Sequence, residues 1–229
     1  MSKQSKTVGV LGGMGPAATL DFFARVLALT DAKTDQDHLR LIIDNNPQVP
    51  NRNDAIVGTG PSPAPTLVAM AQGLERAGAE LLVMPCNAAH AFLADVKRAT
   101  RLPVVSIIDV TVEATRANHR VGLLAADGCI NAGLYQNAFG KLGVETIVPS
   151  AQTRERFMAT LYRIKQGDTG HEVRTAMRSV ATDLISQGAE IIVAGCTEVP
   201  LVLDANDIDA PFVNSTDCLA KAAIAAARS

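Results

Sequence analysis

Two stretches of this chain, 110 residues apart, carry the same pattern. GAELLVMPCNAAH runs from Gly78 to His90 and GAEIIVAGCTEVPL from Gly188 to Leu201, so the shared glycine (188 − 78) and the shared cysteine (196 − 86) have the same offset. In each copy Gly-Ala-Glu ends a predicted helix, an apolar run predicts a buried strand, and a cysteine stands where that strand gives way to a loop. Cys86 and Cys196 therefore occupy equivalent places in two halves of the chain.

Two further pairs of matching segments indicate that the duplication covers most of the chain. TVGVLGGMG at Thr7 matches RVGLLAADG at Arg120 with an offset of 113 residues (120 − 7), and LPVVSIID at Leu102 matches APFVNSTD at Ala210 with an offset of 108 (210 − 102). These segments predict buried strands, and helices are predicted between them. Such alternation of strand and helix predicts parallel sheets joined by right-handed crossovers.

The expected fold class is therefore α/β, with two similar Rossmann-like domains that contain parallel sheets and are related by pseudo-twofold symmetry. Residues 1–104 together with 212–229 are expected to form the N-terminal domain, and residues 105–211 the C-terminal domain. The active site is expected in the cleft between them, because ligands of open parallel sheets bind beyond the carboxyl ends of the strands. The fourth strand is expected to run from Leu102 to Asp109, and Pro16 is expected to open the first helix.

Composition excludes several classes of protein. The net charge is −2 and the 21 basic residues are scattered along the 229 positions, which argues against a nucleic-acid-binding surface. Aromatic residues make up only 3% and Trp is absent, so the stacking platforms of single-strand binders are missing. No apolar window has the length of a membrane span, and the MSKQSK start leads into a glycine-interrupted strand, not a signal-peptide core. Four cysteines without close pairing favour reduced thiols in a cytoplasmic enzyme.

The positions of two cysteines predict where the chemistry takes place. Cys86 and Cys196 both fall at carboxyl ends of predicted parallel strands, so two facing halves would bring the thiols to one cleft from opposite sides. A helix start after each cysteine would favour the thiolate through its dipole and free N–H groups. Two opposed sulfurs suit removal of a proton from one face of a carbon and delivery of a proton to the other face, which inverts the stereochemistry at that carbon.

Polar residues near the cysteines indicate a substrate that carries carboxylates. Asn87, Ala88 and Thr197 directly follow the thiols, where side chains or backbone N–H groups can hold a carboxylate or the charge that develops as the proton leaves. Arg52, in the loop beyond the second strand, can form a bidentate pair with a carboxylate. Lys165 offers a second cation from the other half. Two cations and two sets of N–H donors predict a substrate with two carboxylates.

At these residues the chain resembles the aspartate/glutamate racemase family, whose members use neither pyridoxal phosphate nor a metal. The resemblance covers nearly the whole chain and is carried by GVLGGMGPAATLDFF, VPNR, PCNAAH, IKQG and GCTEVPL. It implies that Cys86 and Cys196 are the two acid/base catalysts, and that Arg52 and Lys165 bind substrate carboxylates. The pocket that it implies is also lined by Met14, Asn87, Ala88 and Thr197. Ala88 departs from the family pattern PCNTAH, which leaves only a backbone N–H in place of the Thr hydroxyl.

The resemblance implies a racemase that acts on an amino acid with a side-chain carboxylate, most directly aspartate and secondarily glutamate. It also implies a homodimer that needs no cofactor. Other reactions on the same architecture remain open: broad-specificity amino-acid racemase, hydantoin racemase, maleate isomerase and decarboxylase. A protein that binds a dicarboxylate without turnover also remains open. Two cysteines, where one suffices for a decarboxylase, favour the racemase.

Several other patterns have less specific interpretations. The glycines at 9, 12, 13 and 15 do not fit the dinucleotide fingerprint GxGxxG. Cys86 and His90, four residues apart, could form a metal pair or a thiol dyad, but no second pair accompanies them, so we expect His90 to pack or cap within its helix. Glu198 either polarises the second thiol or is a solvated or helix-start carboxylate. Cys129 and Cys218 are expected to be structural.

Overall fold

The computed structural model describes residues 5–229 and contains two parallel sheets of four strands each. The first sheet has the order β2-β1-β3-β4, with β1 (Val8–Gly12), β2 (Leu41–Asn45), β3 (Leu81–Val83) and β4 (Val104–Val105). The second has the order β6-β5-β7-β8, with β5 (Arg120–Leu124), β6 (Glu145–Ile147), β7 (Ile191–Ala194) and β8 (Phe212–Asn214). The two orders are the same when the second half is renumbered from its own first strand, as an internal duplication predicts. The α/β class with parallel sheets is confirmed.

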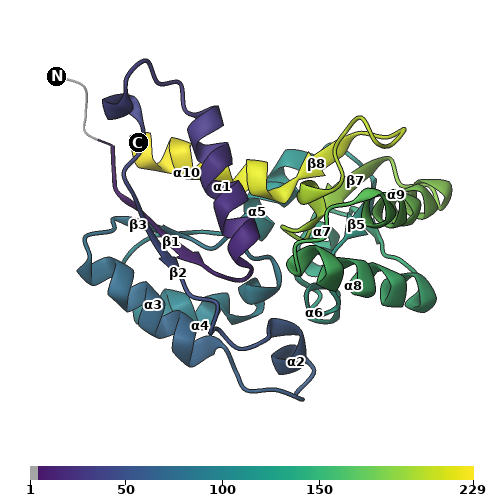
Figure 1. Ribbon diagram of the computed structural model, residues 1–229, viewed down its shortest axis with the longest axis horizontal. Coiled ribbons are helices and arrows are strands. Elements are labelled where there is room, and N and C mark those ends of the chain that lie inside the picture. Colours follow the sequence, from purple (N-terminus) through teal and green to yellow (C-terminus); the bar gives the residue numbers. More distant parts are fainter. Residues whose placement is uncertain (1–4) are drawn as a thin grey trace.

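Helices connect the strands and form two lobes that lie side by side (Figure 1). The α-helices of the first half are α1 (Pro16–Leu29), α2 (Arg52–Ile56), α3 (Ala64–Arg76), α4 (Leu93–Ala99) and α5 (Ile107–Thr115). Those that follow are α6 (Asp127–Asn131), α7 (Leu134–Gly140), α8 (Ala151–Lys165), α9 (His171–Ser186) and α10 (Ser215–Arg228). Three short 3-10 helices complete the connections: η1 (Asp35–Asp37), η2 (Ala88–Phe92) and η3 (Val199–Leu201).

The turn from β1 into α1 shows how local sequence fixes the start of the fold. Gly13 has a φ of +90°, and a Cβ at this position would lie 2.3 Å from the backbone carbonyl carbon of Asn46, so only glycine fits between the two chain segments. Pro16 then occupies the first turn of α1, where its missing N–H has no intrahelical partner to lose. The tight turn keeps Met14 close to the carboxyl ends of the strands.

Apolar side chains form a core that continues from one lobe into the other. Its members come from both sheets and from α1, α5, α7 and α10, and the largest of them that are fully buried include Phe22, Tyr135 and Phe139. A second cluster fills the space between the first sheet and α3, and a third fills the space between the second sheet and α8 and α9. Each sheet is thus covered by helices on both faces, which explains why the inner strands β1, β3 and β7 are continuously apolar.

The fourth strand of each half is shorter than the sequence predicts. β4 ends at Val105, and the expected strand from Leu102 to Asp109 is wrong beyond that residue, because the Ser106 hydroxyl accepts a hydrogen bond from Asp109 N–H and caps α5. β8 likewise ends at Asn214, whose side-chain oxygen accepts from Thr216 N–H and caps α10. A capping side chain satisfies N–H groups that a helix start leaves free, so the chain turns helical there.

The final segment of the chain belongs to both lobes. β8 pairs with β7 in the second sheet, whereas α10 runs back to pack against α1 and α5 in the first lobe (Figure 1). Sheet pairing therefore places residues 212–214 with the second half and leaves α10 with the first. The division into domains of residues 1–104 plus 212–229 and of residues 105–211 stays a prediction.

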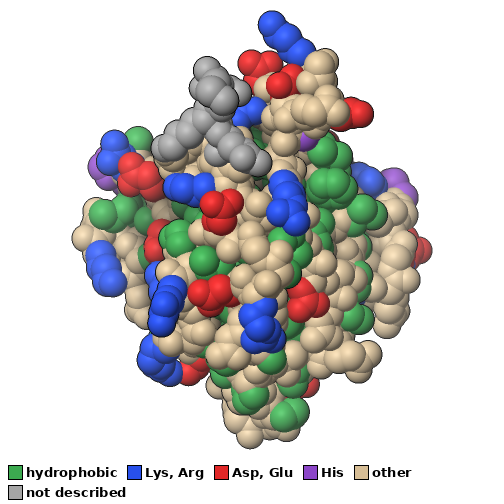
Figure 2. All heavy atoms as spheres, turned by 90° about the vertical axis from the view of Figure 1, so that its left-hand side faces the viewer, with side chains coloured by type: hydrophobic (Ala, Val, Ile, Leu, Met, Phe, Trp, Pro, Cys, Tyr) green, Lys and Arg blue, Asp and Glu red, His purple; other side chains and the backbone are tan. Residues whose placement is uncertain are grey.

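Charged side chains are mixed on the face that the first lobe presents. Figure 2 shows Lys and Arg interspersed with Asp and Glu over this face, with apolar side chains between them. Within residues 5–229, no helix combines the length and the apolar character needed to cross a membrane.

Candidate active site

The two cysteines that the sequence singled out stand in loops that directly follow inner strands. Cys86 is joined to β3 by Met84 and Pro85, and Cys196 to β7 by Gly195. Both lie at the carboxyl ends of their strands, and their side chains are almost fully buried, with exposed fractions of 6% and 8%. The thiols therefore project into the interior, where the two lobes meet.

A single small cavity between the lobes is lined by both cysteines and by the other residues predicted for the site. The complete lining consists of Met14, Arg52, Asn53, Cys86, Asn87, Ala88, Ala126, Lys165, Gly195, Cys196, Thr197 and Glu198. The structure thus brings together all eight predicted residues from segments spread over more than half of the chain. Four lining residues were not predicted for the site: Asn53, Ala126, Gly195 and Glu198. For the first three, the only signal in the sequence is their position. Asn53 and Gly195 are neighbours of predicted residues, and Ala126 matches Gly13 at the 113-residue offset (126 − 13).

The cavity is small. Its volume is about 30 Å³, which is room for about two water molecules. Helix α2 covers one side, where Asn53 Oδ1 accepts a hydrogen bond of 2.8 Å from Gly128 N–H at the start of α6. This contact joins the first lobe to the second at the rim.

Arg52 enters the cavity from the start of α2 with part of its guanidinium unused. Its Nη1 donates to the carbonyl oxygens of Val49 and Pro50 at 3.1 and 3.0 Å, and its Nη2 donates to the carbonyl of Met14 at 3.5 Å. The Nε is buried and has no hydrogen-bond partner within residues 5–229. A buried, unpaired N–H of a cation is costly unless an anion meets it, so the arrangement favours a carboxylate in the cavity.

Lys165 does not stand free, because it forms an ion pair with Glu198 across the cavity wall. The other carboxylate oxygen of Glu198 accepts a hydrogen bond of 3.0 Å from the thiol of Cys196. Glu198 has an exposed fraction of only 3%, so the alternative of a carboxylate in solvent is wrong, whereas its expected place at a helix start is confirmed, because it directly precedes η3. The ammonium of Lys165, the carboxylate of Glu198 and the thiol of Cys196 thus form a continuous series of contacts.

These contacts determine the protonation states of Cys196 and Lys165. Burial raises the pKa of the Cys196 thiol well above its usual value, the Glu198 carboxylate raises it further, and Lys165 acts in the opposite direction. The expected lowering by a helix dipole is wrong for Cys196, because only the short 3-10 helix η3 follows it. Burial alone would lower the pKa of Lys165, but the neighbouring negative groups outweigh it and the pKa is raised. Cys196 is therefore held as a thiol beside a charged ammonium.

Asn87 lines the cavity, and its side chain also forms two hydrogen bonds within the protein. Its Oδ1 accepts a hydrogen bond of 2.7 Å from the Tyr135 hydroxyl, and its Nδ2 donates to Ser215 Oγ at 3.2 Å. One Nδ2 hydrogen is thus engaged within the protein, and the second Nδ2 hydrogen and the backbone N–H remain the candidate donors to a carboxylate. Ala88 and Thr197 line the cavity as predicted.

His90 is buried behind Cys86 and forms part of the support of its loop. Its Nδ1 lies 2.9 Å from the Cys86 carbonyl oxygen, and Ile107 N–H donates to its Nε2 at 3.1 Å. These partners require the tautomer with hydrogen on Nδ1, which donates to the carbonyl. Burial lowers the pKa of His90 to about 4, so the ring is neutral at pH 7. With both ring nitrogens engaged in hydrogen bonds, His90 caps and packs as expected. Neither nitrogen is left to bind a metal together with Cys86 or to form a dyad with its thiol.

A model of the Asp/Glu/Hydantoin racemase family matches residues 11–223 of the chain. The chain belongs to this family. It is accordingly a racemase, an enzyme of the isomerase class.

Relatives of this racemase include enzymes with different substrates in their names. It is 26% identical over 222 residues to the broad specificity amino-acid racemase RacX of Bacillus subtilis, a match that covers 95% of this chain and 96% of the relative. It is 30% identical over 178 residues to the glutamate racemase of Corynebacterium glutamicum, covering 71% of this chain and 62% of that one. The structure of Picrophilus torridus aspartate racemase is similar with a TM-score of 0.84 at 26% identity, covering 97% of this chain and 94% of that chain.

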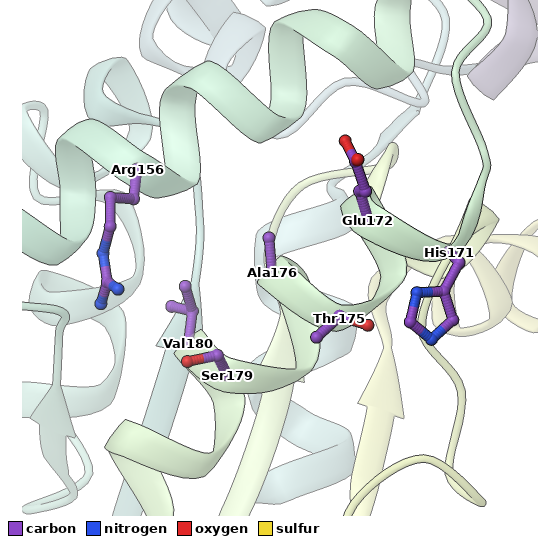
Figure 3. A pocket seen from close by; sticks show the side chains of 7 residues that line it. All are labelled: Arg156, His171, Glu172, Thr175, Ala176, Ser179 and Val180. Carbon is purple, nitrogen blue, oxygen red and sulfur yellow. The ribbon is translucent and has the colours of Figure 1, made fainter.

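A second hollow of the racemase contains neither Cys86 nor Cys196. A wider and more open hollow of about 360 Å³ lies between α8 and α9, and Figure 3 shows Arg156 extending from α8 toward the side chains of α9. Its lining consists of Arg156, His171, Glu172, Thr175, Ala176, Ser179 and Val180 and includes neither cysteine. Cys129 is fully buried in α6, which raises the pKa of its thiol, and Cys218 is half-buried in α10. The small cavity between the lobes is thus the better candidate.

Proposed function

We propose that this racemase interconverts the enantiomers of aspartate without a cofactor, by moving the Cα proton between Cys86 and Cys196. The observation that carries the proposal is the placement of these two thiols, one from each half, on the lining of one cavity that also contains two cations. Two thiols from matching loops are the equipment for proton transfer at two faces of one carbon. A binding protein would need the cations but would have no use for the paired thiols.

The reaction requires one sulfur to start as thiolate and the other as thiol. The thiolate takes the Cα proton and becomes a thiol, the electron pair passes into the adjacent carboxylate as an enolate-like charge, and the opposite thiol then protonates Cα from the other side. Since burial and Glu198 keep Cys196 protonated, Cys196 acts first as the acid and Cys86 as the base in one direction. The reverse direction begins from the opposite protonation of the pair.

Two cations give the cavity its preference for an acidic amino acid. The unpaired Nε of Arg52 supports binding of one carboxylate, and Lys165 can bind the second if it divides its hydrogen bonds between the substrate and Glu198. Backbone N–H groups that follow the cysteines would receive the charge that develops on the carboxylate next to Cα. Aspartate is the amino acid whose two carboxylates are closest together, which suits a small cavity.

A broader specificity has one observation in its favour. Ala88 lines the cavity with a methyl group where the family pattern has a Thr hydroxyl, and a relative covering almost the whole chain is a broad specificity racemase. A methyl group removes a hydrogen-bonding requirement on the substrate. Glutamate and neutral amino acids are therefore the competing substrates to assay.

The test is a chiral assay of all amino acids with purified protein in D₂O and no added cofactor. We expect aspartate to invert from both enantiomers, with deuterium incorporated at Cα. Cys86→Ser and Cys196→Ser should each abolish inversion, while Cys218→Ser in α10 should retain it. Inversion at the wild-type rate in either of the first two variants would refute the two-thiol mechanism, and a panel without any inversion would refute the racemase proposal.

A further inference from the structure

A line of buried hydrogen bonds joins the loops that carry the two thiols. The hydroxyl of Tyr135 in α7 donates to Asn87 Oδ1 at 2.7 Å, and Asn87 Nδ2 donates to Ser215 Oγ at 3.2 Å. Ser215 in turn donates to the Ala194 carbonyl oxygen at 2.6 Å. Tyr135 and Ser215 have exposed fractions of 0%, and Asn87 of 2%, so water does not compete for these bonds.

Two members of this line lie next to the reactive groups. Asn87 directly follows Cys86, and Ala194 is the last residue of β7, separated from Cys196 by Gly195 alone. The line therefore spans from the loop of the first thiol to the strand that delivers the second. A proton moved between two sulfurs and one carbon requires their separation to be held to a fraction of an ångström.

The duplication supplies an internal comparison for Tyr135. The residue at the 113-residue offset (135 − 22) is Phe22 on α1, which is also fully buried, so the core at this place accepts a ring without a hydroxyl. The hydroxyl in the second half is thus not required to fill the core. Burial raises the pKa of Tyr135 well above its usual value, and the hydroxyl keeps its proton as a permanent donor. The Thr111 and Ser215 side chains lie beside it as further hydrogen-bonding groups.

We propose that Tyr135 is a positioning residue for the racemase, whose hydroxyl holds Asn87 and through Ser215 fixes the spacing between the loops of Cys86 and Cys196. This role rests on the proposed function, since it presupposes that both thiols act on one carbon. Tyr135 touches neither the cavity nor a substrate, because it is absent from the residues that line the space. Without the hydroxyl, Asn87 Oδ1 becomes a buried acceptor with no donor, and the Cys86 loop shifts to find one.

The test compares Tyr135→Phe with Tyr162→Phe, which removes the hydroxyl of the other tyrosine of the chain, an exposed residue of α8. We expect Tyr135→Phe to lower kcat about 10- to 100-fold and to leave KM within about threefold, as for a misplaced catalytic group. In D₂O, starting from the enantiomer whose proton Cys196 removes, the variant should also build up deuterium in that enantiomer faster relative to inversion than wild type does. Delivery from the misplaced Cys86 thiol is slowed, whereas return from Cys196 is not.

The isotope ratio separates positioning from simple loss of folded enzyme. A smaller folded fraction lowers exchange and inversion by the same factor and leaves their ratio unchanged. A Tyr135→Phe enzyme with wild-type kcat, or with a lower kcat but the wild-type ratio, would overturn the proposal. Should Tyr135→Phe fail to fold, Ser215→Ala interrupts the same line at its centre and is held to the same outcomes.

A readout without substrate distinguishes this proposal from the proposed function. Amide hydrogen exchange across residues 84–92 should be about tenfold faster in Tyr135→Phe than in wild type, because the loop loses a buried hydrogen bond, and unchanged in Tyr162→Phe. If the wild-type protein inverts no amino acid, the proposed function fails while this measurement still decides the structural link. Unchanged exchange in Tyr135→Phe would overturn the link itself.

Discussion

Acidification should weaken this fold through a single buried ring. His90 is neutral in the folded protein, where burial lowers its pKa to about 4, whereas an unfolded chain protonates histidine near the ordinary value of 6.5. The unfolded state therefore binds more protons between these values, so the stabilising contribution is complete above pH 6.5 and is lost as the pH falls toward 4. A second hydrogen on Nε2 would also face the N–H of Ile107, which now donates to that nitrogen.

The size of the effect follows from the difference between the two pKa values. A shift from 6.5 to about 4 corresponds to about 3 kcal/mol of unfolding free energy when the titration is complete. Between pH 7.5 and pH 5 the loss amounts to about 2 kcal/mol by the same relation. Carboxylates with lowered pKa values, such as Asp37 and Asp168, lose their contribution only at lower pH, because their ordinary value is 3.8.

Urea unfolding followed by circular dichroism at pH 7.5 and pH 5 measures this loss. His90→Gln keeps an amide that can donate and accept but does not titrate, so its stability should change by about 2 kcal/mol less than that of wild type between the two conditions. His171→Gln, at the exposed start of α9, serves as the matched control and should behave as wild type. If His90→Gln loses as much stability as wild type on acidification, the buried ring is not the cause.

Three further substitutions test the cavity and the turn beside it. Arg52→Lys should lower kcat/KM by about tenfold or more, because an ammonium cannot reproduce the bidentate pair that we propose between Arg52 and a substrate carboxylate. Steady-state kinetics measure this ratio, and an unchanged value would contradict the proposed role of Arg52. Glu198→Gln removes a charge that raises the pKa of Cys196, so alkylation of this thiol, followed by mass spectrometry, should begin at lower pH; an unshifted profile would argue against the contact. Gly13→Ala forces a Cβ against the backbone of Asn46 at a positive φ, so thermal unfolding should show a loss of about 1 to 3 kcal/mol, and an unchanged melting temperature would count against the tight turn.

Sequence reasoning placed the site because the relevant signal is local and repeated. The duplicated pattern fixes Cys86 and Cys196 at strand ends, and the rule that parallel strands present their carboxyl ends to the ligand brings them together. The lengths of the fourth strands were not predictable from apolar runs alone. Whether Ser106 continues a strand or caps a helix depends on which N–H group donates a hydrogen bond to its hydroxyl. The apolar residues that follow Ser106 are compatible with either structure.

Contacts between distant segments account for what the sequence did not reveal. The Tyr135 to Asn87 bond joins residues 48 positions apart, and the Asn87 to Ser215 bond joins residues 128 positions apart, so no spacing rule contains them. One signal was present nonetheless: a tyrosine where the matching half has a phenylalanine. The protonation of Cys196 was likewise hidden, because burial and the Glu198 carboxylate outweigh a dipole that the short helix after the loop hardly provides.

The two cysteines of this racemase have unequal contacts, since the Cys196 thiol donates to an acidic side chain, whereas the backbone carbonyl of Cys86 accepts from the neutral ring of His90. Mirror-image amino acids nevertheless have the same free energy in water, so their equilibrium constant is one and kcat/KM must be equal for conversion from either hand. Under the proposed two-thiol mechanism, the imbalance between the sulfurs can therefore appear only in the separate values of kcat and KM for each direction, whose ratio is common to both. One enantiomer will saturate the enzyme at lower concentration and turn over more slowly, and its mirror image will do the reverse.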